Sequence, residues 1–178
     1  MNFIKKKKLR IGILGGTFDP AHLGHLTISK IAKKKFNLNI VLWIITEKNP
    51  FKKKALLSLN ERFLHSKKIT KKTRYIKVKF LEKKIKSKYN INLIKYIKRI
   101  NPSINIYYIM GADSLINFNK WKKWKEIIKL CKIIVFDRKG FKSKAFKSKA
   151  LIYMDKSQWK FIKFKKVNIS SSQIRKIW

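Results

Sequence analysis

Short apolar runs alternate along this chain with longer segments in which apolar residues recur every three or four positions. The runs cover residues 11–14, 39–45, 103–110 and 131–136, and residues 74–80 alternate between apolar and polar. The runs predict buried strands, and the segments between them predict amphipathic helices. Repeated strand–helix units with non-alternating strands indicate a parallel sheet covered by helices on both faces. We therefore expect a Rossmann-like, doubly wound α/β fold with parallel strands in the order 3-2-1-4-5.

Capping residues and local composition add detail to the prediction for the second helix and for the region after the fifth strand. Ser58 is a good N-cap for the second helix, and Glu61 follows it at the spacing of a capping box. After the fifth strand, residues 141–149 are basic and of low complexity, and we expect a loop there. Residues 151–154 and 159–164 predict two further short strands.

The composition is that of a globular protein and indicates one domain over residues 1–178. Hydrophobic residues make up 45% of the 178 positions, which is enough to bury a core. No apolar run reaches the length of about 18 residues that a membrane helix needs, so no membrane association is expected. The basic, weakly apolar N-terminus does not predict a signal peptide. The single Cys131 cannot form an internal disulfide, which suits the reducing cytoplasm, and we expect it to be a small buried hydrophobe.

The net charge is unusual. The chain has 47 Lys and Arg residues against 8 acids, a formal charge of +39. Such a charge is expected of a nucleic-acid-binding protein, which is one alternative function. The lysines, however, are spread over nearly every segment and accompany abundant Ile, Asn and Phe, as codon bias in an AT-rich genome would produce. We therefore expect nucleic acid to bind only nonspecifically at low salt. No pattern in the sequence indicates an oligomeric state.

The strongest candidate for chemistry is the turn after the first apolar run. Gly15 and Gly16 allow close approach of the backbone to a ligand, and Asp19–Pro20 makes a turn. A helix then begins near His22. Strand, glycine turn and helix N-terminus together form a site that attracts phosphate. Because His22 and His25 are three positions apart, both rings should point toward that phosphate.

Further candidates follow the later strands. Gly111 ends the fourth apolar run, and Asp113 can either cap the next helix or accept hydrogen bonds from ribose hydroxyls. Trp121 can either pack against the sheet or stack on a flat heteroaromatic ring. Near the end of the chain, three serines at 170–172 open a predicted helix, and Arg175 one turn later can bind a phosphate through its planar fork.

Three motifs resemble those of one enzyme family. They are GGTFDPAHLGH at residues 15–25, GADSLINFNKWKKWKEI at 111–127 and ISSSQIR at 169–175. The outer two resemble motifs of the HxGH nucleotidyltransferase superfamily, and the middle one is similar to that of bacterial nicotinate-nucleotide adenylyltransferases. The resemblance implies that ATP and nicotinate mononucleotide are the substrates. Sister enzymes that act on pantetheine phosphate or nicotinamide mononucleotide are the nearest alternatives.

The resemblance also implies roles for individual residues. It implies a catalytic role for His22, His25 and Arg175. It implies that ATP is bound by Gly15, Gly16, Thr17, Phe18, Gly111, Asp113, Ser170 and Ser171. The acceptor would be bound by Lys52, Tyr89, Asn90 and Trp121. No protein ligand for a metal is expected, and Mg²⁺ should arrive with ATP, held by phosphate oxygens and water. Few residues follow the serine motif, so we expect the helical tail that covers the site in this family to be short or absent.

Overall fold

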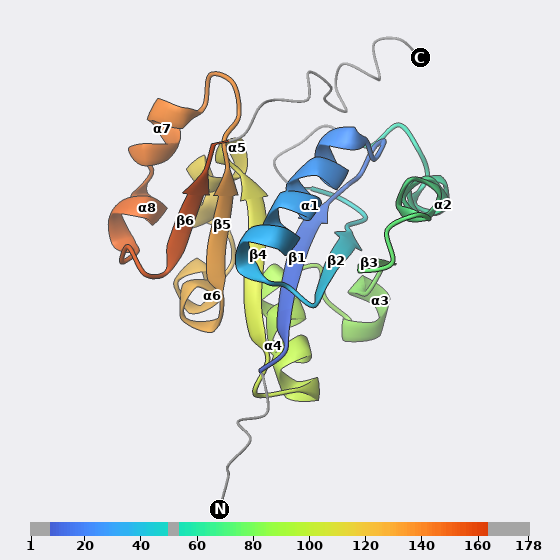
Figure 1. The fold of residues 1–178 in the computed structure, drawn as a ribbon, viewed down its shortest axis with the longest axis horizontal. Helices are drawn as coiled ribbons and strands as arrows, with labels where there is room; N and C mark the ends of the chain where they lie inside the picture. The colour runs from blue at the N-terminus through green and yellow to red at the C-terminus, as the bar shows by residue number, and fades with distance from the viewer. Residues whose placement is uncertain (1–7, 50–53, 164–178) are drawn as a thin grey trace, which may run out of the picture.

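The computed structural model describes residues 8–49 and 54–163, and its centre is a parallel sheet (Figure 1). The strand order is β3-β2-β1-β4-β5-β6, and every neighbouring pair is parallel. The strands are β1 Arg10–Gly16, β2 Ile40–Ile45, β3 Ile76–Lys79, β4 Asn105–Gly111, β5 Lys132–Phe136 and β6 Trp159–Ile162. The expected order of the first five strands is confirmed, and β6 extends the sheet beyond β5.

Helices cover both faces of this sheet, as predicted for a doubly wound fold. The helices are α1 Leu23–Phe36, α2 Leu59–Thr70, α3 Glu82–Ile85, α4 Asn90–Ile100, α5 Ala112–Ile116, α6 Trp124–Leu130, α7 Lys142–Phe146 and α8 Lys149–Tyr153, with a 3-10 turn η1 at Phe118–Lys120. Figure 1 looks onto the face that α1 crosses. Successive strand residues alternate between the two cores: Ile13 and Tyr108 pack with α4, whereas Leu14 and Tyr107 pack on the side of α1.

The region after β5 differs from the prediction. Residues expected to form a basic loop and a short strand instead form α7 and α8. Ser148 caps α8 by accepting a hydrogen bond from the backbone N–H of Leu151, at 3.4 Å. Ala150, Leu151 and Met154 are buried, which is helical spacing. The run 151–154 was too short for its period to distinguish a strand from a helix turn.

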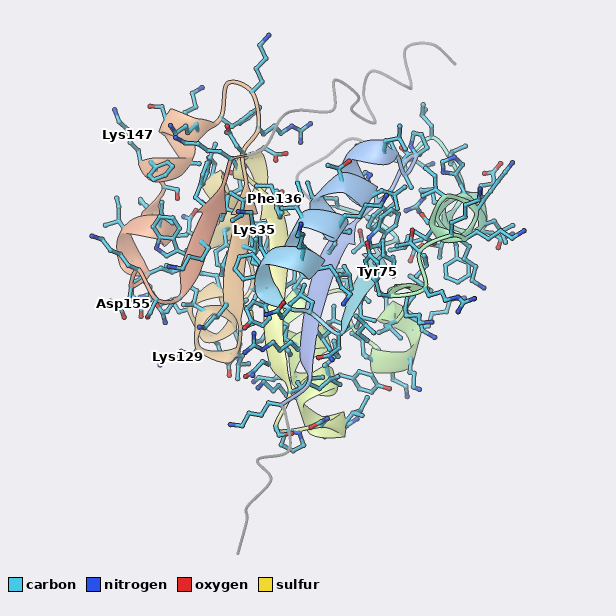
Figure 2. All side chains as sticks on the ribbon, viewed as in Figure 1. Lys35, Tyr75, Lys129, Phe136, Lys147 and Asp155 are labelled. Atoms are coloured by element: carbon cyan, nitrogen blue, oxygen red, sulfur yellow. The ribbon has the colours of Figure 1, made fainter. Side chains whose placement is uncertain are left out.

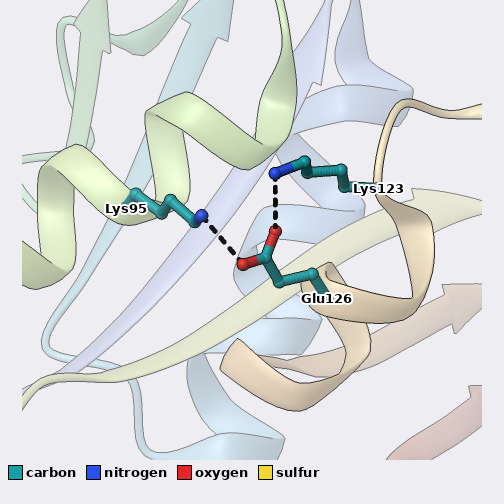
Figure 3. Close-up of polar contacts among 3 residues, drawn as sticks. All are labelled: Lys95, Lys123 and Glu126. Carbon is teal, nitrogen blue, oxygen red and sulfur yellow. Dashed lines mark ion pairs between the residues drawn. The ribbon is translucent and has the colours of Figure 1, made fainter.

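The helices on the α4 face are also joined by exposed charges. Glu126 of α6 accepts from Lys95 of α4 at 2.8 Å and lies 3.9 Å from Lys123 (Figure 3). The hydrogen bond from Lys95 lowers the pKa of Glu126. All three side chains are well exposed, so the cluster contributes little to the free energy of unfolding. Cys131, at the end of α6, is buried as expected, and burial raises its pKa to about 12.

The positive charge is not confined to one face. Lys35 on α1, Lys129 on α6 and Lys147 after α7 all lie at the surface on different sides of the fold (Figure 2). Within residues 8–49 and 54–163, no helix combines the length and the apolar character needed to cross a bilayer.

Candidate active site

The turn between β1 and α1 brings two imidazole rings to the head of a helix. His22 is the N-cap of α1, and its Nδ1 atom accepts a hydrogen bond from the backbone N–H of Gly24 at 3.1 Å. In return, Nδ1 of His25 accepts from the backbone N–H of His22 at 3.2 Å, which completes a capping box built from two histidines. The ring centroids are 3.9 Å apart. Both rings therefore lie at the positive end of a 14-residue helix.

These hydrogen bonds determine which nitrogen of each ring carries the proton when the imidazole is neutral. Because Nδ1 of each ring accepts a hydrogen bond, the ring proton must reside on Nε2. An Nε2–H group is a hydrogen-bond donor, which is what a phosphate oxygen requires. The helix cap and an anion would thus use opposite edges of the same imidazole, and the backbone arrangement favours anion binding as well.

A stack of aromatic rings supports His25. Phe18 is 2% exposed, and its ring centroid lies 4.8 Å from that of His25 and 5.0 Å from that of Trp43, on which it stacks. Nε1 of Trp43 donates to Oγ of Ser29 at 2.8 Å, and this hydroxyl donates to the carbonyl of His25 at 2.8 Å. Phe18 has φ of 49°, in the left-handed region that costs a bulky residue energy. Packing against a fully buried residue of β2 therefore holds the histidine turn in place.

Gly15 adjoins a buried tyrosine of the neighbouring strand. The hydroxyl of Tyr108 on β4 donates to Oδ1 of Asn90 at 3.0 Å, and a Cβ atom on Gly15 would lie 2.7 Å from that hydroxyl oxygen. The ring of Trp121 meets Tyr108 edge-on, with centroids 5.6 Å apart. Burial raises the pKa of Tyr108, which keeps it a donor. Three predicted site residues, Gly15, Asn90 and Trp121, thus surround Tyr108. Tyr108 itself was predicted only to be part of a strand.

Replacing Gly15 with alanine is expected to lower the free energy of unfolding by about 1–3 kcal/mol, the usual cost of overpacking. The new methyl would clash with the Tyr108 hydroxyl, which cannot withdraw without losing its bond to Asn90. The double variant Gly15→Ala/Tyr108→Phe removes the clashing oxygen and should recover most of the loss. Urea denaturation of both single variants, the double variant and the parent measures this coupling, and strictly additive losses would contradict it.

The carboxyl end of β4 holds Gly111 and Asp113. Gly111 is the N-cap of α5, and Asp113 lies in the first turn without capping it, so the capping interpretation of Asp113 is wrong. Its Oδ2 atom instead accepts from Nη1 of Arg138 at 2.6 Å. Arg138 follows β5, so this ion pair joins α5, which follows β4, to the segment after the neighbouring strand. It lies on the β4 side of the histidine turn.

A cavity of about 540 Å³ opens on the other side, at the carboxyl ends of β2 and β3. Its wall is formed by Phe80, Ser87, Tyr89 and Asn92 and by six charged residues, Glu47, Glu82, Lys83, Lys86, Lys88 and Lys122. The Tyr89 ring lies under Nζ of Lys122, 4.3 Å from the ring centroid, with Nζ of Lys88 at 5.9 Å. Burial raises the pKa of Glu82, whose Oε1 accepts from the backbone N–H of Glu47. The cavity therefore presents both ammonium and carboxylate groups.

The predicted acceptor-binding residues lie in different surroundings in the structure. Tyr89 lines this cavity, and Asn90 lies beside it in a smaller hollow that it shares with Thr46. Trp121 packs on Tyr108 and Phe118. Four predicted site residues, Lys52, Ser170, Ser171 and Arg175, lie outside the described residues.

Sequence reasoning missed Glu82, Lys88, Lys122 and a buried arginine. Arg62 on α2 is 2% exposed and donates from Nη1 to the carbonyls of Thr17 and Thr46, both at 2.8 Å. One signal was available, because arginine is scarce in this lysine-rich chain and an arginine on the inward face of a helix indicates a need for its planar fork. The two lysines had no such signal among so many others.

Two proteins that are similar in sequence to this chain carry the same name. The chain matches the family model described as cytidylyltransferase-like over residues 13–177. It is 54% identical to a protein of Pelagibacter ubique (strain HTCC1062) named "Probable nicotinate-nucleotide adenylyltransferase", over 99% of this chain and 97% of that protein. A Rhizobium etli protein of the same name is 40% identical over 73% of this chain and 68% of its own length.

Solved structures share the fold of this chain. The Plasmodium falciparum nicotinic acid mononucleotide adenylyltransferase complexed with NaAD has a TM-score of 0.73 and 23% identity, and covers 94% of this chain and 83% of its own. The same protein complexed with APC gives a TM-score of 0.73 at 22% identity, with the same coverage. At these identities the likeness establishes the fold, with six parallel strands and helices on both faces.

Proposed function

This chain belongs to the cytidylyltransferase-like family and, within it, to the nicotinate-nucleotide adenylyltransferases, and we propose that it transfers the adenylyl group of ATP to nicotinate mononucleotide, giving deamido-NAD and pyrophosphate. The observation that carries the proposal is the pair of imidazoles capping α1 at the carboxyl end of β1, a central strand of the sheet that neighbours β4. In a doubly wound sheet, ligands bind at this point, where the strand order reverses.

The reaction needs no protein nucleophile. The phosphate of the acceptor attacks the α-phosphorus of ATP in line, and pyrophosphate leaves, so the protein has to align two anions and stabilise developing negative charge. His22 and His25 donate from Nε2 to the triphosphate in this proposal. In this proposal the backbone N–H groups of Gly15, Gly16, Thr17 and Phe18 lie beside them. The N-terminus of α1 adds partial positive charge.

The β4 side of the site would hold the nucleoside. Gly111 leaves room for the adenosine at the end of β4, and the carboxylate of Asp113 accepts from ribose hydroxyls. The ion pair with Arg138 holds this carboxylate in one orientation. We propose that Ser170, Ser171 and Arg175 bind the phosphates from the other flank, as the serine motif of the family implies.

The β2–β3 side would hold the acceptor. Nicotinate mononucleotide carries a cationic pyridinium ring with a carboxylate, together with a phosphate. The cavity offers carboxylates and ammonium groups to these opposite charges. Tyr89 lines this cavity and Asn90 lies beside it, so they can offer aromatic and amide surface to the acceptor. Trp121, which packs on Tyr108, and Lys52 are proposed as further contacts.

We expect Mg²⁺ to enter with ATP. Phosphate oxygens and water would hold it, because Mg²⁺ prefers oxygen ligands and keeps several waters when it binds with a nucleotide. Mg²⁺ bound to the phosphates neutralises part of their charge.

A pyrophosphate-release assay tests the proposal. The protein is supplied with ATP, Mg²⁺ and either nicotinate mononucleotide, nicotinamide mononucleotide or pantetheine phosphate. We expect the highest kcat/KM with nicotinate mononucleotide, with a dinucleotide as the second product. Faster reaction with pantetheine phosphate, or no pyrophosphate from any acceptor, would refute it.

Lys122→Gln is expected to raise KM for nicotinate mononucleotide by about threefold to tenfold, the scale of one charged contact near a surface. KM for ATP and for nicotinamide mononucleotide should change little, because only the acidic acceptor offers a ring carboxylate to the ammonium group. Lys125→Gln is the matched control, since Lys125 also lies over a tyrosine, 4.7 Å from the Tyr153 ring centroid, but outside the cavity. Equal effects of both substitutions would indicate a response to net charge alone.

A further inference from the structure

Arg62 is a buried cation that binds backbone carbonyls from three separate segments. Its Nε atom donates to the carbonyl of Leu57 at 3.1 Å, just before α2. Nη1 donates to Thr17 and Thr46 at 2.8 Å, and Nη2 donates to Glu47 at 3.3 Å. The side chain is 2% exposed. Every nitrogen of the guanidinium therefore donates a hydrogen bond to at least one backbone carbonyl.

No carboxylate lies within ion-pair distance of Arg62 among the described residues. Burial lowers the pKa of Arg62, and the carboxylates of Asp19, Glu47 and Glu82 oppose that shift from further away. A buried charge is costly unless it is fully hydrogen-bonded, so this arrangement depends on all the carbonyls being in place. The guanidinium and the backbone around it consequently define one rigid geometry.

The segments that Arg62 joins belong to the two halves of the site. Thr17 lies in the glycine–histidine turn, the proposed ATP side, whereas Glu47 lines the cavity proposed for the acceptor. Asp19, 3% exposed, closes the network by accepting from the backbone N–H groups of Leu56 and Leu57, both at 3.0 Å. One side chain thereby connects the end of β1, the end of β2 and the start of α2.

We infer that Arg62 is a positioning residue that sets the separation and orientation of the ATP-binding turn relative to the acceptor cavity. This inference rests on the proposed function. The planar fork reaches carbonyls in several fixed directions at once, which a lysine ammonium group on a flexible stem cannot reproduce. Each half of the site keeps its own contacts without Arg62, so the loss should fall on the alignment of the two substrates. A misplacement of about 1 Å can reduce a rate by about a hundredfold.

The test compares Arg62→Lys with the parent in two kinds of measurement. Calorimetry gives Kd for ATP alone and for nicotinate mononucleotide alone, and we expect each to stay within about threefold of the parent. Turnover should fall by about tenfold to a hundredfold, and affinity for deamido-NAD, which spans both halves, should fall more than that for either substrate. Arg62→Gln, which retains two N–H donors, provides a second variant if Arg62→Lys does not fold.

The matched control is Arg10→Lys. Arg10 also donates to a carbonyl, that of Phe36 at 3.3 Å, but it lies at the opposite end of β1. Thermal melting accompanies every assay, so that turnover is measured well below each Tm. The inference is overturned if Arg62→Lys turns over no more slowly than Arg10→Lys, or if its loss lies entirely in the two separate Kd values. An inactive parent protein overturns the proposed function as well, whereas an active parent with an undiminished variant overturns this inference alone.

Discussion

Replacing His25 with alanine is expected to lower kcat by about two orders of magnitude or more, the loss typical of one electrostatic contact to a transition state. His25 sits beside His22 at the head of α1, and its tautomer leaves Nε2 as the donor. Charge on the transferring phosphoryl group develops there in the proposed reaction. The chain should remain folded, because the ring adjoins the core rather than filling it.

A second substitution separates the chemistry from the helix cap. His25→Ala also removes the acceptor for the backbone N–H of His22, which should cost about 0.5–2 kcal/mol of stability. His25→Gln restores an acceptor at this capping-box position and should recover stability while kcat stays low. Urea denaturation and steady-state kinetics provide the two readouts.

The matched control is His65, the third histidine of the chain, which lies on α2. Burial lowers its pKa, and it takes no part in the histidine turn. His65→Gln should leave kcat within about twofold of the parent, as for a substitution without contact to the substrate. Unchanged turnover in His25→Ala would refute the assignment of His25 to the triphosphate.

Replacing Trp43 with alanine is expected to cost about 3–5 kcal/mol of unfolding free energy, the usual range for removing a buried tryptophan. Trp43 is fully buried in β2, where it stacks on Phe18 and donates to Ser29. The substitution leaves a cavity beneath the histidine turn and removes that hydrogen bond. Guanidinium denaturation measures the loss.

Two milder variants separate packing from hydrogen bonding. Trp43→Phe keeps most of the ring volume but deprives the Ser29 hydroxyl of its donor, so it should lose about 1–3 kcal/mol. Adding Ser29→Ala removes the hydroxyl as well and should cost little more, because the acceptor that lost the indole N–H is then gone. If Trp43→Ala lost less than about 1 kcal/mol, the surrounding residues would have closed the cavity and the support of Phe18 would be minor.

The sequence predicted best those features that depend on neighbouring residues. The capping box at Ser58 and Glu61 is present, with bonds of 2.7 and 3.3 Å, because its partners are three positions apart. The pairing of His22 and His25 has the same local origin. The apolar runs predicted the strands because a strand buried on both faces must be apolar at every position.

Features that depend on distant residues were not predictable in this way. Tyr108 looked like one strand residue among several, and only the pairing of β4 with β1 places its hydroxyl beside Gly15 and Asn90. Asp113 was open to a capping interpretation until the fold placed Arg138 2.6 Å from its carboxylate. In each case the partner is more than fifteen positions away, beyond the reach of any local pattern.

By itself the sequence determined the parallel sheet, the helix that His22 caps and the pairing of two imidazoles in the glycine–histidine turn, since each follows from short-range periodicity and capping. The tertiary structure alone decided how that turn is joined to the cavity proposed for the acceptor. Arg62 lies 45 positions from Thr17 and 15 from Glu47, and its hydrogen bonds form only once the ends of β1 and β2 lie side by side. The hydrogen bonds of a buried guanidinium are set by the packing around it, which no segment of the chain specifies alone.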